Sequence, residues 1–144
     1  MKYPRLWRTL FLALALATAG ADAVDRPAGA DFAEIQRVIY RQIEAFRSED
    51  AVQAFSLISP GAQKHFDNPD EFLRTVKLTY EPIVLSVSLQ FRDPWPVRED
   101  VLQEVLLSDG GGNVTTAYFV AQRQSDGSWR ISGCVLARSA LVWT

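Results

Sequence analysis

Hydrophobic residues recur every three or four positions in the first half of the chain and at every second position after residue 82. The first helical stripe consists of Phe32, Ile35, Ile39, Ile43 and Phe46. The stripe begins directly after Asp31. Asp31 and Glu34 have the spacing of a capping box. The pattern therefore predicts a helix over residues 32–47.

Helix start and stop signals divide the next 35 residues into shorter pieces. Ser48 is expected to cap a second helix that reaches Ile58, and a further turn is expected over residues 62–66. Asn68 before Pro69 combines a capping residue with proline at the first helical position, which predicts a helix over residues 69–79. Pro82 is expected to prevent its continuation.

After Pro82 the alternation of apolar and polar residues predicts four antiparallel strands, at residues 83–91, 100–107, 114–124 and 129–138. The last two are joined by Asp126-Gly127, a pair favoured where both turn residues need a positive φ. Gly133 within the last strand suits a bulge or bend. Helices followed by a meander predict an α+β fold, with N-terminal helices packed in the concave face of a curved four-stranded sheet.

Several positions of this framework match a known pattern, most of all the closing hairpin. They are Ile39, Gln42, Ile43, Ala45, Phe46, Ala54-Phe55-Ser56, Ser59-Pro60, Tyr80, Pro82, Asp126-Gly127, Trp129-Arg130-Ile131 and Gly133-Cys134. The chain resembles the cone-shaped α+β domains of the nuclear transport factor 2-like superfamily, and within it a family of small exported bacterial proteins of uncharacterised function. The resemblance implies the fold, an exported location and a cavity between sheet and helices. It supplies no catalytic residues.

The first residues have the composition of a secretory signal peptide. Lys2, Arg5 and Arg8 precede an apolar run over residues 10–19, and small residues then allow cleavage after Ala21 or Ala23. The run is about half the length that a membrane span needs, so cleavage is preferred to a retained anchor. We expect a signal peptide at residues 1–21, a linker at 22–30 and one domain at 31–144, in the periplasm or secreted, with no stable membrane span.

Charge and cysteine content narrow the possible partners. Removing the leader changes the formal net charge from −2 to −5, and an acidic surface argues against binding to nucleic acid. Cys134 is the only cysteine, so no intramolecular disulfide can form. One cysteine and one histidine are too few for a Cys/His metal cluster, and we expect neither a metal nor a cofactor.

Polar and semi-polar groups set among apolar positions are typical of a mostly hydrophobic pocket that orients a small ligand. The candidate ligand-binding residues are Tyr40, Gln42, Tyr80, Gln103, Tyr118 and Cys134. The same tyrosines would also suit an ordinary core with one hydrogen-bonded hydroxyl each. The leading hypothesis is non-catalytic binding of a small apolar ligand or a protein partner in a cone-shaped cavity.

A proton-transfer enzyme, of the isomerase or dehydratase kind, is the alternative. It would need a carboxylate on the inner face of the sheet, and Glu104 lies in mid-strand among apolar residues. Alternation places Glu104 and Gln103 on opposite faces, but leaves open which face is inside. His65 is a weaker catalytic candidate, because it follows helix-ending signals and is expected at the surface.

A third alternative is a structural or assembly protein that uses the sheet surface. Trp95 lies between Pro94 and Pro96, so an extended loop could hold it rigidly as an anchor for a protein partner or a homodimer contact. A tryptophan in this position can equally fold back over the open end of the sheet. The sequence leaves both arrangements open.

Overall fold

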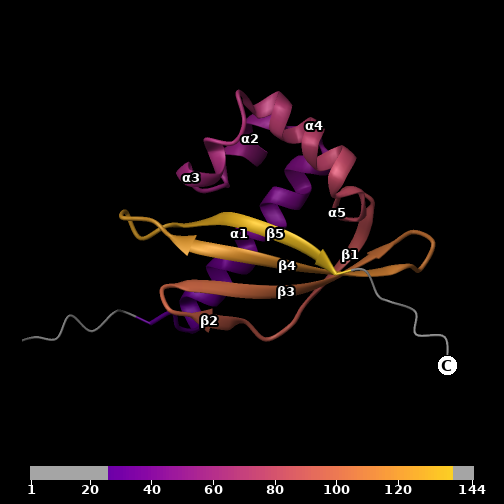
Figure 1. Ribbon diagram of the computed structural model, residues 1–144. Coiled ribbons are helices and arrows are strands. Elements are labelled where there is room, and N and C mark those ends of the chain that lie inside the picture. Colours follow the sequence, from indigo (N-terminus) through magenta and orange to yellow (C-terminus); the bar gives the residue numbers. More distant parts are fainter. Residues whose placement is uncertain (1–25, 138–144) are drawn as a thin grey trace, which may run out of the picture.

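The computed structural model describes residues 26–137, which form helices followed by an antiparallel sheet (Figure 1). The expected signal peptide with its cleavage sites lies outside the described residues, as does the start of the expected linker. Across residues 26–137, no helix combines the length and the apolar character that a membrane crossing requires. The α+β class predicted from the order of the elements is confirmed.

Within the described residues, five helices precede the sheet. They are α1 (Gly29–Arg47), α2 (Ala51–Ser56), α3 (Pro60–Gln63), α4 (Pro69–Thr79) and α5 (Glu81–Val84). Helix α1 begins three residues earlier than predicted, because the Asp31 carboxylate accepts a hydrogen bond from the backbone N–H of Ala28 at 3.0 Å. Asp31 is therefore a residue of the first turn and not the cap. Its negative charge still lies at the positive end of the helix dipole.

The later helices follow their start signals with two corrections. Asp50, not Ser48, caps α2, by accepting a hydrogen bond from the N–H of Gln53. Asn68 caps α4 as predicted, with its side chain 2.9 Å from the N–H of Glu71. Helix α4 ends at Thr79 as predicted, and Pro82 lies in the first turn of a separate helix, α5, where a missing N–H is tolerated. The predicted strand over 83–91 is correspondingly shorter.

The sheet has five strands, not the four predicted. They are β1 (Ser86–Phe91), β2 (Trp95–Val97), β3 (Asp100–Asp109), β4 (Val114–Arg123) and β5 (Trp129–Ala137). The order is β1-β3-β4-β5, and the short strand β2 pairs with β3 beyond the end of β1. Pro96 is compatible with β2 because this strand lies at an edge, where a missing ladder donor is tolerated.

The helices gather on one face of the sheet, which is the buried face (Figure 1). Alternation along β3 turns Val101, Gln103, Val105 and Leu107 toward them. Ile131 of β5 is held to the segment after α2: its N–H donates to Leu57 at 2.9 Å and its carbonyl accepts from Ser59 at 2.8 Å. This contact covers part of the β5 edge and fixes α2 and α3 above it.

The strand β5 bends where the sequence suggested it would. The pairing register of β4 and β5 shifts between Val120 and Ala121, opposite Gly133 and Ile131, so Ser132 is the extra residue of a bulge. The hairpin before β5 differs from the prediction. Only Gly127 has a positive φ there, of 84°, and the loop has three residues closed by a bond from the N–H of Gln124 to the carbonyl of Ser128.

Candidate functional site

A cavity of about 250 Å³ lies between helices α1 and α4 and the strand β5. Most of its wall is apolar, from the core-facing sides of these elements. The lining residues are Gln42, Phe46, Ile58, Ala62, His65, Phe66, Phe72, Thr75, Val76, Tyr80, Ile83, Phe119, Ile131, Ser132, Gly133 and Cys134. The bulge in β5 contributes three of them in succession, Ser132, Gly133 and Cys134.

Three phenylalanines form one wall of the cavity. The Phe72 ring contacts Phe66 edge-on, with centroids 5.0 Å apart, and lies 5.8 Å from the Phe46 ring at a tilted angle. Rings in such arrangements attract each other through the positive edge and negative face of their π-systems. This wall therefore offers a ligand aromatic faces and edges in fixed positions.

The polar groups of the lining are few and neutral. The Tyr80 hydroxyl donates a hydrogen bond to the carbonyl of Cys134 at 3.2 Å, which joins the end of α4 to the edge of β5. Burial raises the pKa of the Cys134 thiol to about 12, so it stays protonated at neutral pH. A thiol in that state is a poor nucleophile. It acts here as a small apolar surface.

Fixed charges are absent from the described cavity wall, which contains no Asp, Glu, Lys or Arg. The side chain of His65 is exposed and lies at the rim. Within residues 26–137, no three His, Cys, Asp or Glu side chains are grouped so that they could hold a metal ion. The arrangement can therefore bind an uncharged apolar molecule by burial and shape.

Comparison with known proteins places the chain in a family. Residues 28–142 match the model of the domain of unknown function DUF4864, which covers all but the first two residues of the described fold. The chain belongs to the DUF4864 family. No curated protein matches the sequence.

Two solved structures share the fold of this DUF4864 chain. One is Aln2 from a Streptomyces species, at 15% identity and a TM-score of 0.50, over 81% of this chain and 96% of Aln2. The other is a protein from Catenulispora acidiphila, at 16% identity and a TM-score of 0.50, over 75% of this chain and 91% of that one. At these identities the likeness concerns the fold alone.

Of the six ligand-binding candidates named from the sequence, the structure brings three together at the cavity. Gln42, Tyr80 and Cys134 all line it. Tyr40 lies on the outer side of α1 and is 52% exposed. Tyr40 therefore has no part in the cavity wall.

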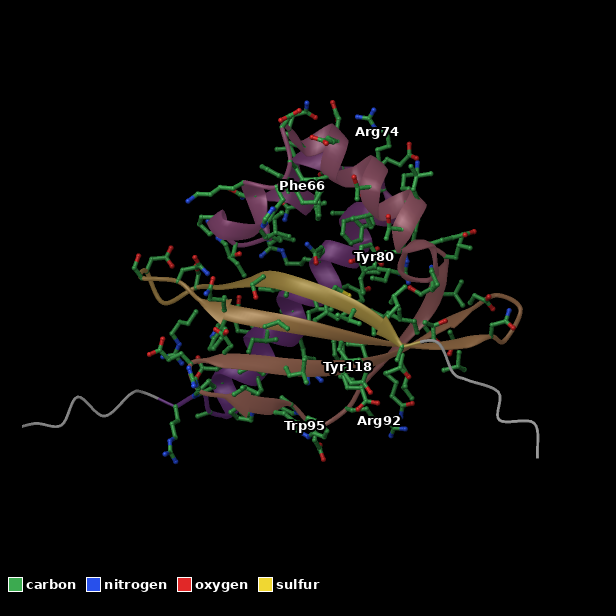
Figure 2. The ribbon with its side chains drawn as sticks, viewed as in Figure 1. Phe66, Arg74, Tyr80, Arg92, Trp95 and Tyr118 are labelled. Atoms are coloured by element: carbon green, nitrogen blue, oxygen red, sulfur yellow. The ribbon has the colours of Figure 1, made fainter. Side chains whose placement is uncertain are left out.

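The remaining two candidates, Gln103 and Tyr118, also lie away from the cavity. Gln103 is fully buried, but its amide Nε2 donates to the carbonyls of Arg92 at 2.6 Å and Glu104 at 3.0 Å. Tyr118 stands opposite Glu104 in the sheet, on the face turned away from the helices. Figure 2 shows Tyr118 on that side, whereas Phe66 and Tyr80 lie between sheet and helices.

The candidates for the alternative functions are spread over the molecule. His65 is at the cavity rim, whereas Glu104 points to the outer face, because its neighbours Gln103 and Val105 are the buried ones. Trp95 is 61% exposed and belongs to β2, opposite Leu102 on the outer face (Figure 2). The described cavity thus has no carboxylate for the proton-transfer alternative.

Sequence reasoning missed the residues that make most of the cavity wall. Phe66 lies in the expected turn over residues 62–66 and Phe72 and Val76 lie in the expected helix over residues 69–79, but nothing in the sequence marks them, Thr75 or Ala62 as a cavity wall. The helical period correctly identifies which side of α4 is inside. It does not reveal that a cavity lies between this side and β5.

Proposed function

We propose that this DUF4864 domain binds a small, uncharged, apolar ligand in the cavity between α1, α4 and β5. The proposal rests on one observation: a space of about 250 Å³ whose walls are aromatic and aliphatic side chains, with only a few neutral polar groups. Folded interiors are normally packed to crystal-like density, so a partly open apolar space of this size between core elements favours a ligand site. Apolar pockets with a few placed polar groups are the usual form of a ligand site.

The polar contacts around the cavity support a ready-made site. Tyr80 holds the end of α4 to β5 through the Cys134 carbonyl, and the Ile131 backbone bonds hold the segment between α2 and α3 to the same strand. These parts of the cavity wall are therefore fixed before a ligand arrives, which reduces the entropy lost on binding. Within this proposal the domain has the cone-shaped architecture of nuclear transport factor 2-like proteins and works outside the cytoplasm, as its leader sequence suggests.

The test uses indene, an uncharged two-ring hydrocarbon, as the probe. Thr75 lies in the cavity wall on α4, so Thr75→Phe should fill the space and weaken indene binding at least tenfold in calorimetric titration. Leu78→Phe is the matched control, because Leu78 lies on the same helix but is 80% exposed. The affinity of Leu78→Phe for indene should equal that of the natural protein.

Two results would reject the proposal. One is the absence of saturable indene binding to the natural protein. The other is equal binding by both phenylalanine variants, with thermal unfolding showing that both are folded. Binding to the outer face would then be favoured, as the partner-binding alternative requires.

A further inference from the structure

Two buried glutamines differ in how fully their amides are bonded. Gln103 uses its Nε2 for two backbone carbonyls, and its Oε1 lies 3.5 Å from the Nε2 of Gln36. Gln42 makes a single bond, in which Nε2 donates to the carbonyl of Ala54 at 3.4 Å. A glutamine amide has two donors and an oxygen that can accept twice, so most of the capacity of Gln42 is unused.

The free oxygen of Gln42 borders the cavity. The bond to the Ala54 carbonyl fixes which end of the amide is nitrogen, because a carbonyl can only accept. Within residues 26–137, no group bonds to Gln42 Oε1, although the residue is only 2% exposed. The only side-chain atom there that is both sealed and unbonded is Arg47 Nε. Gln42 Oε1 is therefore not sealed, and the space it faces is the cavity that Gln42 lines.

Burying a polar oxygen without a partner carries a penalty comparable to a lost hydrogen bond. A molecule that fills the cavity and carries a hydrogen-bond donor would remove this penalty by bonding to the acceptor. The Tyr80 hydroxyl is engaged with the Cys134 carbonyl and the Ser132 hydroxyl with the Val120 carbonyl, and the phenylalanines have no donor.

The cavity size limits the rest of the molecule. A cavity of about 150 Å³ in an engineered protein core holds benzene, with six non-hydrogen atoms. In proportion, about 250 Å³ holds roughly ten, which corresponds to two fused rings. The edge-on phenylalanine wall suits flat rings, whose faces and edges it can match.

We propose that the cavity selects an uncharged two-ring molecule that carries one N–H or O–H donor, and that Gln42 Oε1 accepts this hydrogen bond. This inference rests on the proposed function and specifies its ligand class. Gln42 acts as the specificity-determining residue. The apolar walls supply most of the affinity.

The experiment compares indole with indene, which have the same ring skeleton and size but differ in the N–H donor. The natural protein should bind indole about fivefold to tenfold more tightly than indene, as expected for one hydrogen bond to a buried acceptor. Gln42→Met keeps the length of the side chain and removes the amide, so it should bring the ratio of the two affinities close to one. Gln53→Met, on α2 and outside the cavity lining, is the matched control and should keep the preference.

The outcomes separate the two proposals. If indene binds but indole binds no more tightly to the natural protein, the selection by Gln42 is wrong and the apolar site stands. If the preference for indole survives in Gln42→Met, another group makes the bond and the inference is again wrong. If neither compound binds, the proposed function itself fails. The comparison within the natural protein needs no variant, so poor folding of Gln42→Met leaves the test decisive.

Discussion

Replacing each buried glutamine by methionine should have unequal effects on stability. Gln103→Met removes two short hydrogen bonds, to the carbonyls of Arg92 at 2.6 Å and Glu104 at 3.0 Å, and a long one of 3.5 Å from Gln36 that adds little. At about 1 kcal/mol of net stability per bond, the free energy of unfolding should fall by about 2 kcal/mol. Gln42→Met removes one long bond, of 3.4 Å to Ala54, and should lower it by about 0.5 kcal/mol or less.

The difference is measurable by urea denaturation followed through tryptophan fluorescence, to which Trp129 contributes. Trp129 is buried against the core and its environment changes on unfolding. With a urea dependence of about 1.5 kcal/mol per molar, the midpoint should fall by roughly 1 M for Gln103→Met and by roughly 0.3 M for Gln42→Met. Methionine matches glutamine in length, so packing changes little in either variant.

The ranking of the two variants tests the assignment of Gln42 to ligand recognition. If Gln42→Met lost as much stability as Gln103→Met, Gln42 would be a structural residue whose amide the fold requires. The spare oxygen would then have no functional meaning. As a control, the free energy of unfolding should depend equally steeply on urea in the two variants, which shows that their unfolded states are comparable.

Asp31 and two glycines give the remaining predictions. The backbone N–H of Ala28, followed by the Trp129 indole, keeps the pKa of Asp31 below its usual value, so the ionised carboxylate stabilises the fold. Asp31→Asn should therefore lower the free energy of unfolding by about 1 kcal/mol at pH 7. In urea titrations at several pH values, this loss should shrink as the pH falls below about 4, because the carboxylate of the natural protein then becomes protonated. A loss that grows with acid would contradict this. Gly127→Ala should lower the free energy of unfolding by about 1–2 kcal/mol, because φ is 84° at this position. Gly133→Ala should change it by no more than about 0.5 kcal/mol, because no atom lies within 4 Å of the added carbon. Equal shifts of the two melting temperatures would contradict this prediction.

Local signals in the sequence predicted much of the framework. The stripe from Phe32 to Phe46 and the Asn68-Pro69 start give α1 and α4, since caps and periodicity depend on neighbouring residues alone. The bulge at Gly133 is also a local feature. Errors arose where two local signals competed, as at Pro82, which both ends a pattern and suits the first turn of α5.

The site was harder to predict from the sequence, because it depends on how distant segments pack against each other. Alternation separates Gln103 from Glu104, but which of them is buried depends on where the helices pack. Gln42 and Gln103 look alike in the sequence, and only their hydrogen-bond partners distinguish them: the Ala54 carbonyl for Gln42, and the Arg92 and Glu104 carbonyls for Gln103. The cavity itself lies between α4 and the bulged strand β5, and no periodicity reveals it.

Intermolecular nuclear Overhauser effects between indene and the isotope-labelled protein test the central claim most directly. We expect contacts from the ligand protons to the rings of Phe66 and Phe72 in the phenylalanine wall and to the methyl groups of Ile131 on β5. Contacts confined to Trp95 and Tyr118 would place binding on the outer face of the sheet. That result would contradict the account.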